Sequence, residues 1–463
     1  MLDLRDYQLR AVEAVRDSFR AGKRRPLLVA PTGAGKTVIF SYITHNASQK
    51  GLRTTILVHR AELLTQTHKA LERMNVPHGL VAAGKTPNPT HVVQVASVQT
   101  LVRRLDKFTT PDLIIVDEAH HATAGSWQKV IDAYPSAKVL GVTATPQRLD
   151  GKGLSNAFDD LIRGPEVMDL ISQGWLCRPV YYAPSTVDMS GAKTTGGDYN
   201  RADAEHRVDK PTITGDAVTH YQRLCPGVPA VAFCTSIKHA EHVAQAFNAA
   251  GYKAAVLDGN LDPVERAARV HALANGRLHI LTSCDIISEG FDLPLVTTAI
   301  LLRPTQSLSL HLQQVGRVLR PAPGKDRAFI LDHVGNCLRH GLAEEVRDWS
   351  LDGAKKRKKK DAADDVTPHR QCPACFAVHL PAPICPMCQH VYEVKARTPE
   401  QVAGDLHQLQ VDMEALRALK AKKQEQGKAQ TLEQLIALGK ARGYKNPTAW
   451  ARHLYNARRA RAA

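Results

Sequence analysis

Short apolar runs that alternate with amphipathic stretches occupy the sequence from Pro26 to about Gly341. Ten such runs are bounded by turn residues: RPLLVA, TTILVHR, HVVQVAS, DLIIVDEAH, AKVLGVTAT, AVAFCTS, AAVLDG, HILTSCD, TTAILLR and RAFILDH. Continuous β-branched runs separated by helical segments predict parallel strands that are buried on both faces. We therefore expect doubly wound α/β architecture, and ten strands are too many for one compact unit.

Two breaks divide the chain of 463 residues, for which two or three domains are expected. Residues 176–225 are polar and rich in Gly and Thr, and KKRKKK at 355–360, followed by DAADD, has the composition of a solvated linker. These breaks, together with a cluster of cysteines after the second one, predict six segments. They are a first lobe at 1–178, a connection at 179–224, a second lobe at 225–345, a basic linker at 346–370, a cysteine knuckle at 371–393 and a basic helical tail at 394–463.

The net charge of +16 favours a polyanionic partner, because Lys and Arg surfaces release condensed counterions from phosphate backbones. Residues 351–463 hold 21 Lys and Arg against 11 Asp and Glu, so this C-terminal stretch of linker, knuckle and tail carries ten of the surplus charges. No apolar stretch reaches the roughly 18 residues of a membrane span, and MLDLRDYQLR lacks the features of a signal peptide. We expect a cytoplasmic protein without a membrane partner.

The segment APTGAGKT at 30–37 follows one predicted strand and precedes an amphipathic stretch, the context of a phosphate-binding loop. The glycines allow backbone N–H groups to wrap the phosphates of a nucleotide, Lys36 adds a positive charge, and the Thr37 hydroxyl can bind Mg²⁺. The backbone of this loop comes from Thr32, Gly33, Ala34 and Gly35. The segment therefore predicts an ATP site.

The predicted strand in LIIVDEAH at 113–120 ends in two adjacent carboxylates. Ligand sites in open α/β sheets lie at the carboxyl ends of the strands, so these acids and the phosphate-binding loop can face one pocket. Asp117 then suits Mg²⁺, and Glu118 suits orienting and deprotonating the attacking water. Alone, the same letters could be a helix start, where acids are favoured.

Two arginines in QQVGRVLRP at 313–321, Arg317 and Arg320, are three residues apart. Such a pair is often a solvated helix face. In a two-lobed ATPase, however, the charge of the transition state requires a cation from outside the lobe that holds the phosphates, and an arginine finger contributes about 10³–10⁵ in rate. These arginines are the candidates for that role.

Together these motifs resemble the superfamily 2 helicases, in the DEAH-box branch related to type III restriction-enzyme helicase subunits, many of them bacterial or phage-borne. The resemblance runs from Leu4 to Asp332. It implies two tandem RecA-like lobes, with ATP and Mg²⁺ between them. It also accounts for Ala30 at the first position of the phosphate-binding loop, a variant that this group uses.

The resemblance assigns further residues of the nucleotide site. LRDYQ at 4–8 is similar to the adenine-recognition element, in which Gln8, assisted by Arg5, reads the base. TATP at 143–146 is similar to the element that couples hydrolysis to lobe movement through Thr143 and Thr145. SEGFDLP at 288–294 is similar to the motif in which Gly290 approaches the nucleotide and Asp292 holds the ribose.

Other motifs resemble the family's nucleic-acid contacts. LVHRAELLTQ at 57–66 implies a phosphate contact by Arg60, and SVQTL at 97–101 implies backbone contacts by Gln99 and Thr100. In the second lobe, FCTSIKHAE and LTSCD imply strand contacts by Thr235 and Thr282. The branch favours DNA over RNA.

Four of the nine cysteines form two C-x-x-C pairs, Cys372 with Cys375 and Cys385 with Cys388. This pattern favours a structural four-thiolate Zn²⁺ site. A redox dithiol is the alternative, and His379 and His390 are substitute ligands. The other five cysteines are scattered singly, which indicates reduced core residues.

The tail ends in GYKNPTAWARHLYNARRARAA, where basic residues accompany Tyr444, Trp450 and Tyr455. Such a segment suits nucleic-acid contact by charge and stacking, but a small helical bundle with an aromatic core, or a site for a protein partner, fits as well. For the whole chain we predict an ATP-dependent helicase or translocase. The alternatives are a duplex translocase or remodeller that does not separate strands, an RNA helicase, and a nucleotide-switched binding module.

Overall fold

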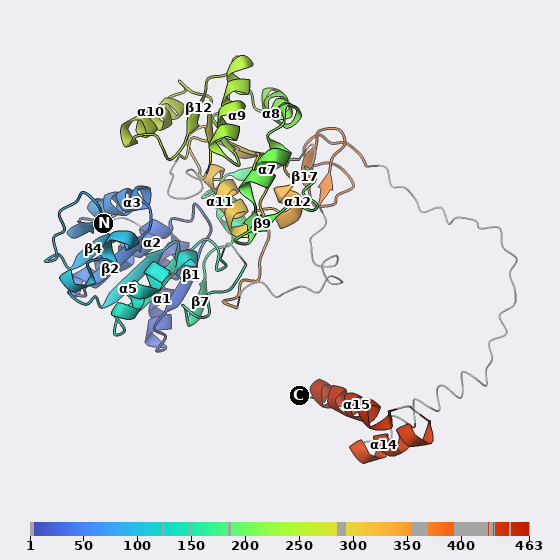
Figure 1. Ribbon diagram of the computed structural model, residues 1–463. Helices are drawn as coiled ribbons and strands as arrows, with labels where there is room; N and C mark the ends of the chain where they lie inside the picture. Colours follow the sequence, from blue (N-terminus) through green and yellow to red (C-terminus); the bar gives the residue numbers. More distant parts are fainter. Residues whose placement is uncertain are drawn as a thin grey trace, which may run out of the picture. The chain divides into compact units, whose positions relative to one another are not determined.

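The computed structural model describes residues 4–122, 125–148, 151–183, 187–284, 293–352 and 369–392, and in the C-terminal part 425, 429, 431–443 and 446–462. The chain divides into two compact units, Met1–Tyr392 and Glu393–Ala463 (Figure 1). The first unit holds two large sheets, one for each predicted lobe, and a small two-stranded sheet.

The first lobe is built on a seven-stranded parallel sheet of order β3-β4-β2-β5-β6-β1-β7. Its strands are β1 (Pro26–Val29), β2 (Thr54–Val58), β3 (His78–Val81), β4 (Val93–Ser97), β5 (Leu113–Asp117), β6 (Lys138–Thr143) and β7 (Asp160–Arg163). Its helices are α1 (Asp6–Arg20), α2 (Lys36–Gln49), α3 (Ala61–Arg73), α4 (Val98–Leu101), α5 (Gly125–Ala133) and α6 (Val167–Ser172), with short 3₁₀ turns η1 (Leu105–Lys107) and η2 (Ala119–His121).

Alternate residues of these strands pack on opposite faces of the sheet, as a strand period of two requires. Leu28, for example, belongs to the core that α1, α2 and α3 cover, whereas its neighbour Leu27 belongs to the core that α4 and α5 cover (Figure 1). Both faces are therefore buried, which explains why the strands read as continuous apolar runs.

The second lobe is built on an eight-stranded sheet of order β12-β13-β11-β14-β15-β8-β17-β16. Its parallel strands are β8 (Arg178–Tyr182), β11 (Ala230–Phe233), β12 (Ala254–Leu257), β13 (Ile280–Ser283), β14 (Thr298–Leu301) and β15 (Arg327–Asp332); the antiparallel edge is β17 (Ala377–His379) and β16 (Arg370–Gln371). A separate hairpin is formed by β9 (Thr194–Thr195) and β10 (Asp198–Tyr199). The helices are α7 (Arg201–Val208), α8 (Pro211–Leu224), α9 (Ile237–Ala249), α10 (Pro263–Ala274), α11 (Leu308–Val318) and α12 (Asn336–His340).

All ten apolar runs contain strands of the two parallel sheets, so the predicted α/β class is confirmed. Two boundaries differ from the prediction. Strand β8 crosses the expected end of the first lobe at residue 178 but pairs with β15 of the second sheet. Strand β17 then pairs with β8, so the cysteine knuckle extends the second sheet instead of standing apart. The sequence analysis did not find the edge strands β17 and β16, because a strand of two or three residues shows no hydrophobic period.

The segment after α12 returns to the first lobe. The carbonyl of Leu351 accepts hydrogen bonds from the amides of Leu154 and Ser155, at 2.7 and 3.0 Å. Trp349 and Leu351 also pack against the first lobe's core. The first residues of the predicted linker therefore bind the two lobes together, while KKRKKK lies outside the described residues.

The C-terminal unit contains α14 (Leu432–Ala441) and α15 (Pro447–Ala462). Thr431 and Gln434 form a capping box at the start of α14. A Cβ added at Gly439 would lie 3.1 Å from the Trp450 ring, so Trp450 packs between the helices. This contact favours the helical-bundle reading for Trp450; Tyr444 lies outside the described residues. Among the described helices, none combines the length and apolar character that a bilayer crossing needs.

Candidate active site

The phosphate-binding loop connects β1 to α2. Gly33 and Gly35 have φ of +93° and +76°, in the left-handed region that glycine reaches at little cost. The amide of Ala30 donates to the Thr143 carbonyl at 3.0 Å, which fixes the loop to the end of β6. Lys36 begins α2, and its Nζ donates to the Ala30 carbonyl at 3.2 Å. The helix amino terminus and this ammonium together suit an anionic phosphate.

Asp117 ends β5, and Glu118 follows in a left-handed conformation with φ of +50°. Burial and the neighbouring Glu118 carboxylate raise the pKa of Asp117 to about 7. The nearby Lys36 ammonium and the Glu118 amide, which donates to Asp117 Oδ1 at 3.0 Å, act in the opposite direction. A bound divalent cation would favour the charged form, so the acid suits Mg²⁺.

The second lobe places two arginines at this site. Burial lowers the pKa of Lys36; the Glu118 and Asp117 carboxylates oppose this effect, and the guanidinium groups of Arg317 and Arg320 add to it. Lys36 therefore lies within electrostatic reach of two carboxylates of its own lobe and two guanidinium groups of the second lobe. A Cβ at Gly33 would lie 3.6 Å from Arg320 Cγ, which places Arg320 beside the phosphate-binding loop.

A chain of polar contacts leads from the DEAH segment to the second lobe. Glu118 Oε2 lies 3.4 Å from His120 Nδ1, and the same nitrogen lies 3.1 Å from Thr143 Oγ1. The Thr143 hydroxyl donates to the Thr145 carbonyl at 2.9 Å, and Thr145 Oγ1 lies 2.5 Å from Ser309 Oγ on α11. Thr143 and Thr145 thus connect the Glu118 carboxylate to α11 of the second lobe. Ser309 was missed because a lone serine carries no sequence signal.

The adenine-recognition element lies against the same loop. Gln8 Nε2 and the Tyr7 hydroxyl donate to the Ala34 carbonyl at 3.4 and 3.1 Å. Arg5 donates to Tyr7 at 3.0 Å, and its guanidinium lies 3.8 Å from the centre of the Trp175 ring. Tyr7 and Trp175 were not predicted. Trp175 lies far along the sequence from the element that it contacts.

The predicted nucleic-acid residues fall into two groups. In the first lobe, Arg60 precedes α3, and exposed Gln99 donates to the His59 carbonyl at 3.3 Å, with Thr100 beside it. Both segments follow parallel strands, so they lie on the edge of the sheet that also carries the nucleotide site. Two residues predicted for the nucleotide site, Gly290 and Asp292, lie outside the described residues.

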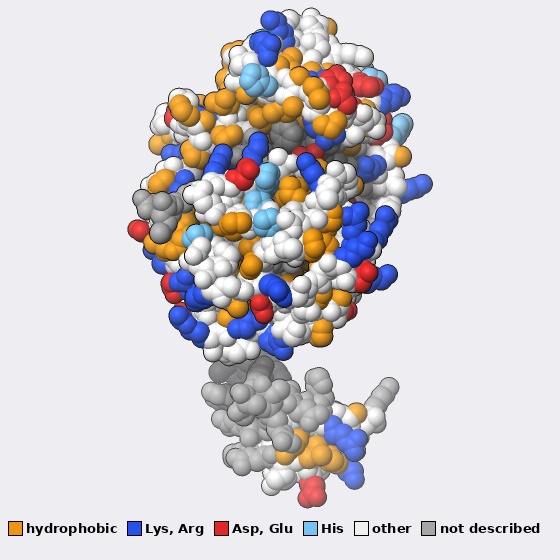
Figure 2. Space-filling model, turned by 90° about the vertical axis from the view of Figure 1, so that its left-hand side faces the viewer, with side chains coloured by type: hydrophobic (Ala, Val, Ile, Leu, Met, Phe, Trp, Pro, Cys, Tyr) orange, Lys and Arg blue, Asp and Glu red, His pale blue; other side chains and the backbone are white. Residues whose placement is uncertain are grey.

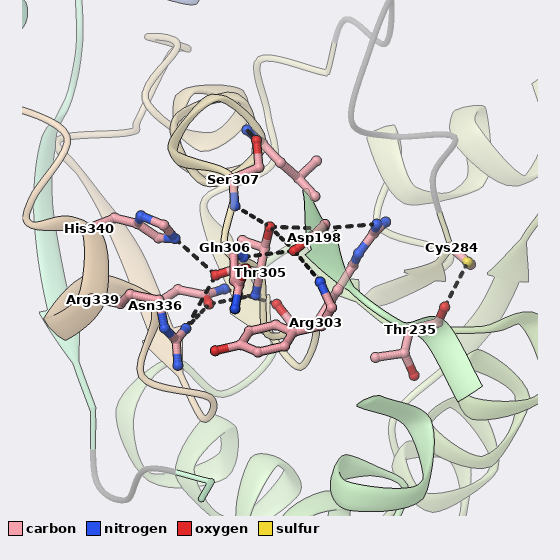
Figure 3. Close-up of polar contacts among 12 residues, drawn as sticks. Asp198, Thr235, Cys284, Arg303, Thr305, Gln306, Ser307, Asn336, Arg339 and His340 are labelled. Atoms are coloured by element: carbon pink, nitrogen blue, oxygen red, sulfur yellow. Dashed lines mark hydrogen bonds and ion pairs between the residues drawn. The ribbon is translucent and has the colours of Figure 1, made fainter. Parts of the chain in front are cut away.

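In the second lobe, the hydroxyls of Thr235 and Thr282 are buried. Thr282 is fully buried and donates to the Ala240 carbonyl at 2.8 Å, and Thr235 Oγ1 lies 2.9 Å from His239 Nδ1. The Thr235 carbonyl accepts a contact from Cys284 Sγ at 3.4 Å (Figure 3). These contacts correspond to strand and helix packing, because a hydroxyl that already serves a neighbouring group is not presented to a ligand.

The four cysteine sulfurs of the knuckle lie within 4.8 Å of one another. Cys372 Sγ is 3.6 Å from Cys388 Sγ, and Cys375 Sγ is 3.7 Å from Cys385 Sγ. Tetrahedral zinc with Zn–S bonds of about 2.3 Å sets its sulfurs about 3.8 Å apart, so the residues fit this metal. Both ring nitrogens of His379 are engaged, by the Leu380 carbonyl and the Tyr392 hydroxyl, and the cluster of candidate ligands at this place consists of the four cysteines.

Comparison with known proteins identifies the family of this chain. Residues 1–148 match the family model of "Type III restriction enzyme, res subunit", and residues 218–322 match "Helicase conserved C-terminal domain". A 51.5 kDa protein of a Lactococcus phage is 34% identical over 401 residues, which cover 86% of this chain and 85% of the phage protein. The chain belongs to the superfamily 2 helicases, in the type III restriction-enzyme branch.

A second relative of this superfamily 2 helicase is "Putative ATP-dependent helicase IRC3" of Saccharomyces cerevisiae, 31% identical over 355 residues. The match covers 72% of this chain but only 51% of the yeast protein. Among solved structures, a fragment of a putative HsdR subunit of a type I restriction enzyme from Vibrio vulnificus has a TM-score of 0.59 at 20% identity, covering 73% of this chain and 66% of that one. This likeness supports the fold.

Proposed function

We propose that this helicase hydrolyses ATP between its two lobes and uses the resulting lobe movements to travel along DNA or unwind it. The observation that carries the proposal is the approach of the second lobe to the phosphate-binding loop: Gly316 lies against Thr32 and Arg320 against Gly33, beside Lys36. An ATPase site completed by the second lobe makes hydrolysis depend on how the lobes meet. This dependence is what a motor requires.

Each charged group has a role that its position supports. Lys36, at the amino terminus of α2, binds phosphate, and Thr37 and Asp117 would hold Mg²⁺, which would neutralise phosphate charge when bound. The Glu118 side chain is buried, and its Oε2 makes no hydrogen bond among the described residues, so that oxygen is available to accept a proton from water. Arg317 and Arg320 would stabilise the charge of the transition state.

Coupling to movement follows from the polar chain between the lobes. A change at Glu118 reaches α11 through His120, Thr143 and Thr145. The same helix carries Arg317 and ends two residues before Arg320, so the state of the acid and the position of the second lobe are linked. Thr143 and Thr145 are therefore proposed as coupling residues.

DNA is the proposed track, supported by the net charge of +16 and by the restriction-enzyme branch. Figure 2 shows one face of the first unit on which Lys and Arg side chains are widely spread and outnumber Asp and Glu. Arg60, Gln99 and Thr100 are proposed contacts. The second lobe's contribution is less specific, because Thr235 and Thr282 are buried.

The deciding experiment measures ATP turnover with single-stranded DNA, duplex DNA, forked DNA and RNA, and then strand separation on the best activator. Stimulation by DNA with unwinding is the expected result. Stimulation by duplex DNA without unwinding would instead indicate a translocase or remodeller, and stimulation by RNA alone would indicate an RNA helicase. A protein that binds ATP but is not stimulated by any of them would be a nucleotide-switched module.

The C-terminal parts are proposed as accessories to this motor, and the cysteine knuckle is proposed to hold structural zinc. The tail after Tyr392 is proposed as a nucleic-acid anchor, with a protein partner as the alternative, and truncation there should flatten the salt dependence of DNA binding. All nine thiols are free of disulfides, which suits the reducing cytoplasm proposed as the site of action.

A further inference from the structure

The hairpin of β9 and β10 lies in the segment that joins the lobes, and one of its carboxylates reaches the loop before α11. Asp198 accepts from the Thr305 hydroxyl at 3.0 Å and from the Gln306 amide at 2.7 Å (Figure 3). Its second oxygen lies 3.7 Å from the Arg303 guanidinium. Asp198 is 107 residues from Thr305 in sequence, so the contact fixes two distant parts of the second lobe.

The amide, the carbonyl and the hydroxyl of Thr305 all make hydrogen bonds. Its amide donates to Asn336 Oδ1 at 3.0 Å, and its carbonyl accepts from His340 Nε2 at 2.9 Å and from Arg339 at 3.3 Å (Figure 3). Its hydroxyl, while donating to Asp198, accepts from the Ser307 amide at 2.9 Å. Among these partners of the Thr305 side chain and backbone, Asp198 is the one that carries a negative charge.

The loop sets the start of α11. Ser307 is the N-cap residue, and its hydroxyl accepts from the Leu310 amide at 3.3 Å. Two residues later, Ser309 contacts Thr145 of the first lobe. A helix is stiff over this length, so the position of its first turn determines where Arg317 lies on α11 and where the helix ends, two residues before Arg320.

The hairpin itself is well braced. Asn200 caps α7 by accepting from the Asp203 amide at 3.2 Å, and its side chain donates to Thr195 at 3.2 Å. Lys193 donates through its amide to Asp203 at 2.9 Å. Asp198 therefore extends from a rigid base, which is what a positioning contact needs.

We propose that Asp198 is a positioning residue for hydrolysis: it fixes the first turn of α11, and thereby the two arginines, relative to the phosphate-binding loop. This inference rests on the proposed function, since it assumes that Arg317 and Arg320 act on the transition state. Asp198 does not touch the nucleotide site. It acts through Thr305, Ser307 and the helix.

The test uses the full chain and steady-state ATP turnover on saturating DNA. Asp198→Ala should lower kcat between about tenfold and a hundredfold, the effect of a small misplacement of a catalytic group, and leave the KM for ATP within about twofold. Asp198→Asn, which keeps one acceptor oxygen, should lose less. Asp188→Asn is the control, because Asp188 is exposed in the same connecting segment and bonds to the Ser190 amide.

A double-mutant cycle separates positioning from general damage. In the background of Arg320→Ala, Asp198→Ala should cause a smaller further loss than it does in the wild type, because one of the two arginines that it positions is gone. Thr305→Val should reproduce the loss and Thr305→Ser should restore turnover, which serves as a second pair if Asp198→Ala folds poorly.

Three results would overturn the inference: wild-type kcat in both Asp198→Ala and Thr305→Val, a loss confined to KM, or an equal loss with and without Arg320. Each of these requires an active wild-type protein. Absence of DNA-stimulated turnover in the wild type would refute the proposed function instead, so the two failures are distinguishable.

Discussion

Thr32 of the phosphate-binding loop and Gly316 of α11 touch across the two lobes. A Cβ at position 316 would lie 2.5 Å from Thr32 Cβ and 3.0 Å from Thr32 Cγ2, closer than carbon atoms can approach. Glycine therefore permits the approach that brings the adjacent Arg317 into the electrostatic reach of Lys36. The contact defines how closely the lobes can meet.

Gly316→Ala should force the two segments apart, because this overpacking costs about 1–3 kcal/mol unless the helix shifts. We expect DNA-stimulated ATP turnover to fall at least about tenfold while ATP binding persists. The matched control is Gly215→Ala in α8, where an added Cβ meets open space. Equal activity in the two variants would show that this contact does not control the site.

Glu118→Gln and Lys36→Ala should separate chemistry from binding. The first keeps the shape of the side chain but loses the base, so ATP binding should survive while turnover falls by about 10²–10⁴. The second removes the phosphate-binding charge and should weaken ATP binding itself. Nucleotide binding followed by fluorescence, together with single-turnover hydrolysis, checks both. Wild-type turnover in Glu118→Gln would remove the assignment of the general base.

Arg320→Ala should cut turnover by about 10³–10⁵ with little change in ATP affinity, since a finger acts mainly on transition-state charge. Arg317→Ala should act in the same direction, with an added loss of stability because Arg317 is 8% exposed. Arg277→Ala, at an exposed arginine of the same lobe, is the control. Normal hydrolysis in both finger variants on DNA would mean that the site is not shared between the lobes.

The sequence predicted the parts of this site that lie on long, periodic elements. The phosphate-binding loop, the DEAH acids and the arginine helix follow or form buried segments whose period is clear, and all ten apolar runs are strands. The parts that it missed depend on tertiary contacts. Ser309, Tyr7 and Trp175 are single residues that gain a role only when distant segments meet.

The polar segment between the lobes shows a second limit of prediction from the sequence: elements without a clear hydrophobic period were not found. Residues 176–225 lack apolar periodicity, which predicted a connection between the lobes, yet they contain β8, the β9–β10 hairpin, α7 and the whole of α8. Strand β8 lies between β15 and β17 in the second sheet, but its RPVYY sequence includes a proline, which argues against an interior strand. Asp198 could not be found from sequence, because its partner Thr305 lies in a loop.

Stability should fall between about pH 6.5 and pH 4. Burial lowers the pKa of His340 to about 4, against the opposing effect of the Thr305 carbonyl, and burial lowers that of His333 to about 3. In this range these histidines become protonated in the unfolded chain but stay neutral in the folded protein. Lowering the pH therefore favours unfolding. Each of the two histidines accounts for a loss of up to about 3 kcal/mol in the free energy of unfolding.

Urea unfolding at pH 7 and pH 5 measures this effect. His340→Gln, which keeps a donor for the Thr305 carbonyl, should lose less stability between the two pH values than the wild type. His271→Gln, at an exposed histidine of α10, should behave as the wild type does. If His340→Gln and the wild type lose the same amount, His340 does not contribute to the pH dependence.

Zinc should stabilise the second lobe and not merely its own knuckle. Strand β17 pairs with β8, and Cys372 and Cys385 belong to the core that α8 and α9 cover. About one zinc per chain is expected, lost in Cys372→Ser with Cys375→Ser. Because the knuckle forms the edge of the lobe's sheet, this loss or chelation should lower the Tm of the whole second lobe, by about 2–4 °C for each kcal/mol lost, and added zinc should restore it after chelation. A knuckle that unfolded alone, with lobe unfolding and ATP turnover unchanged, would instead show that the edge strands are dispensable.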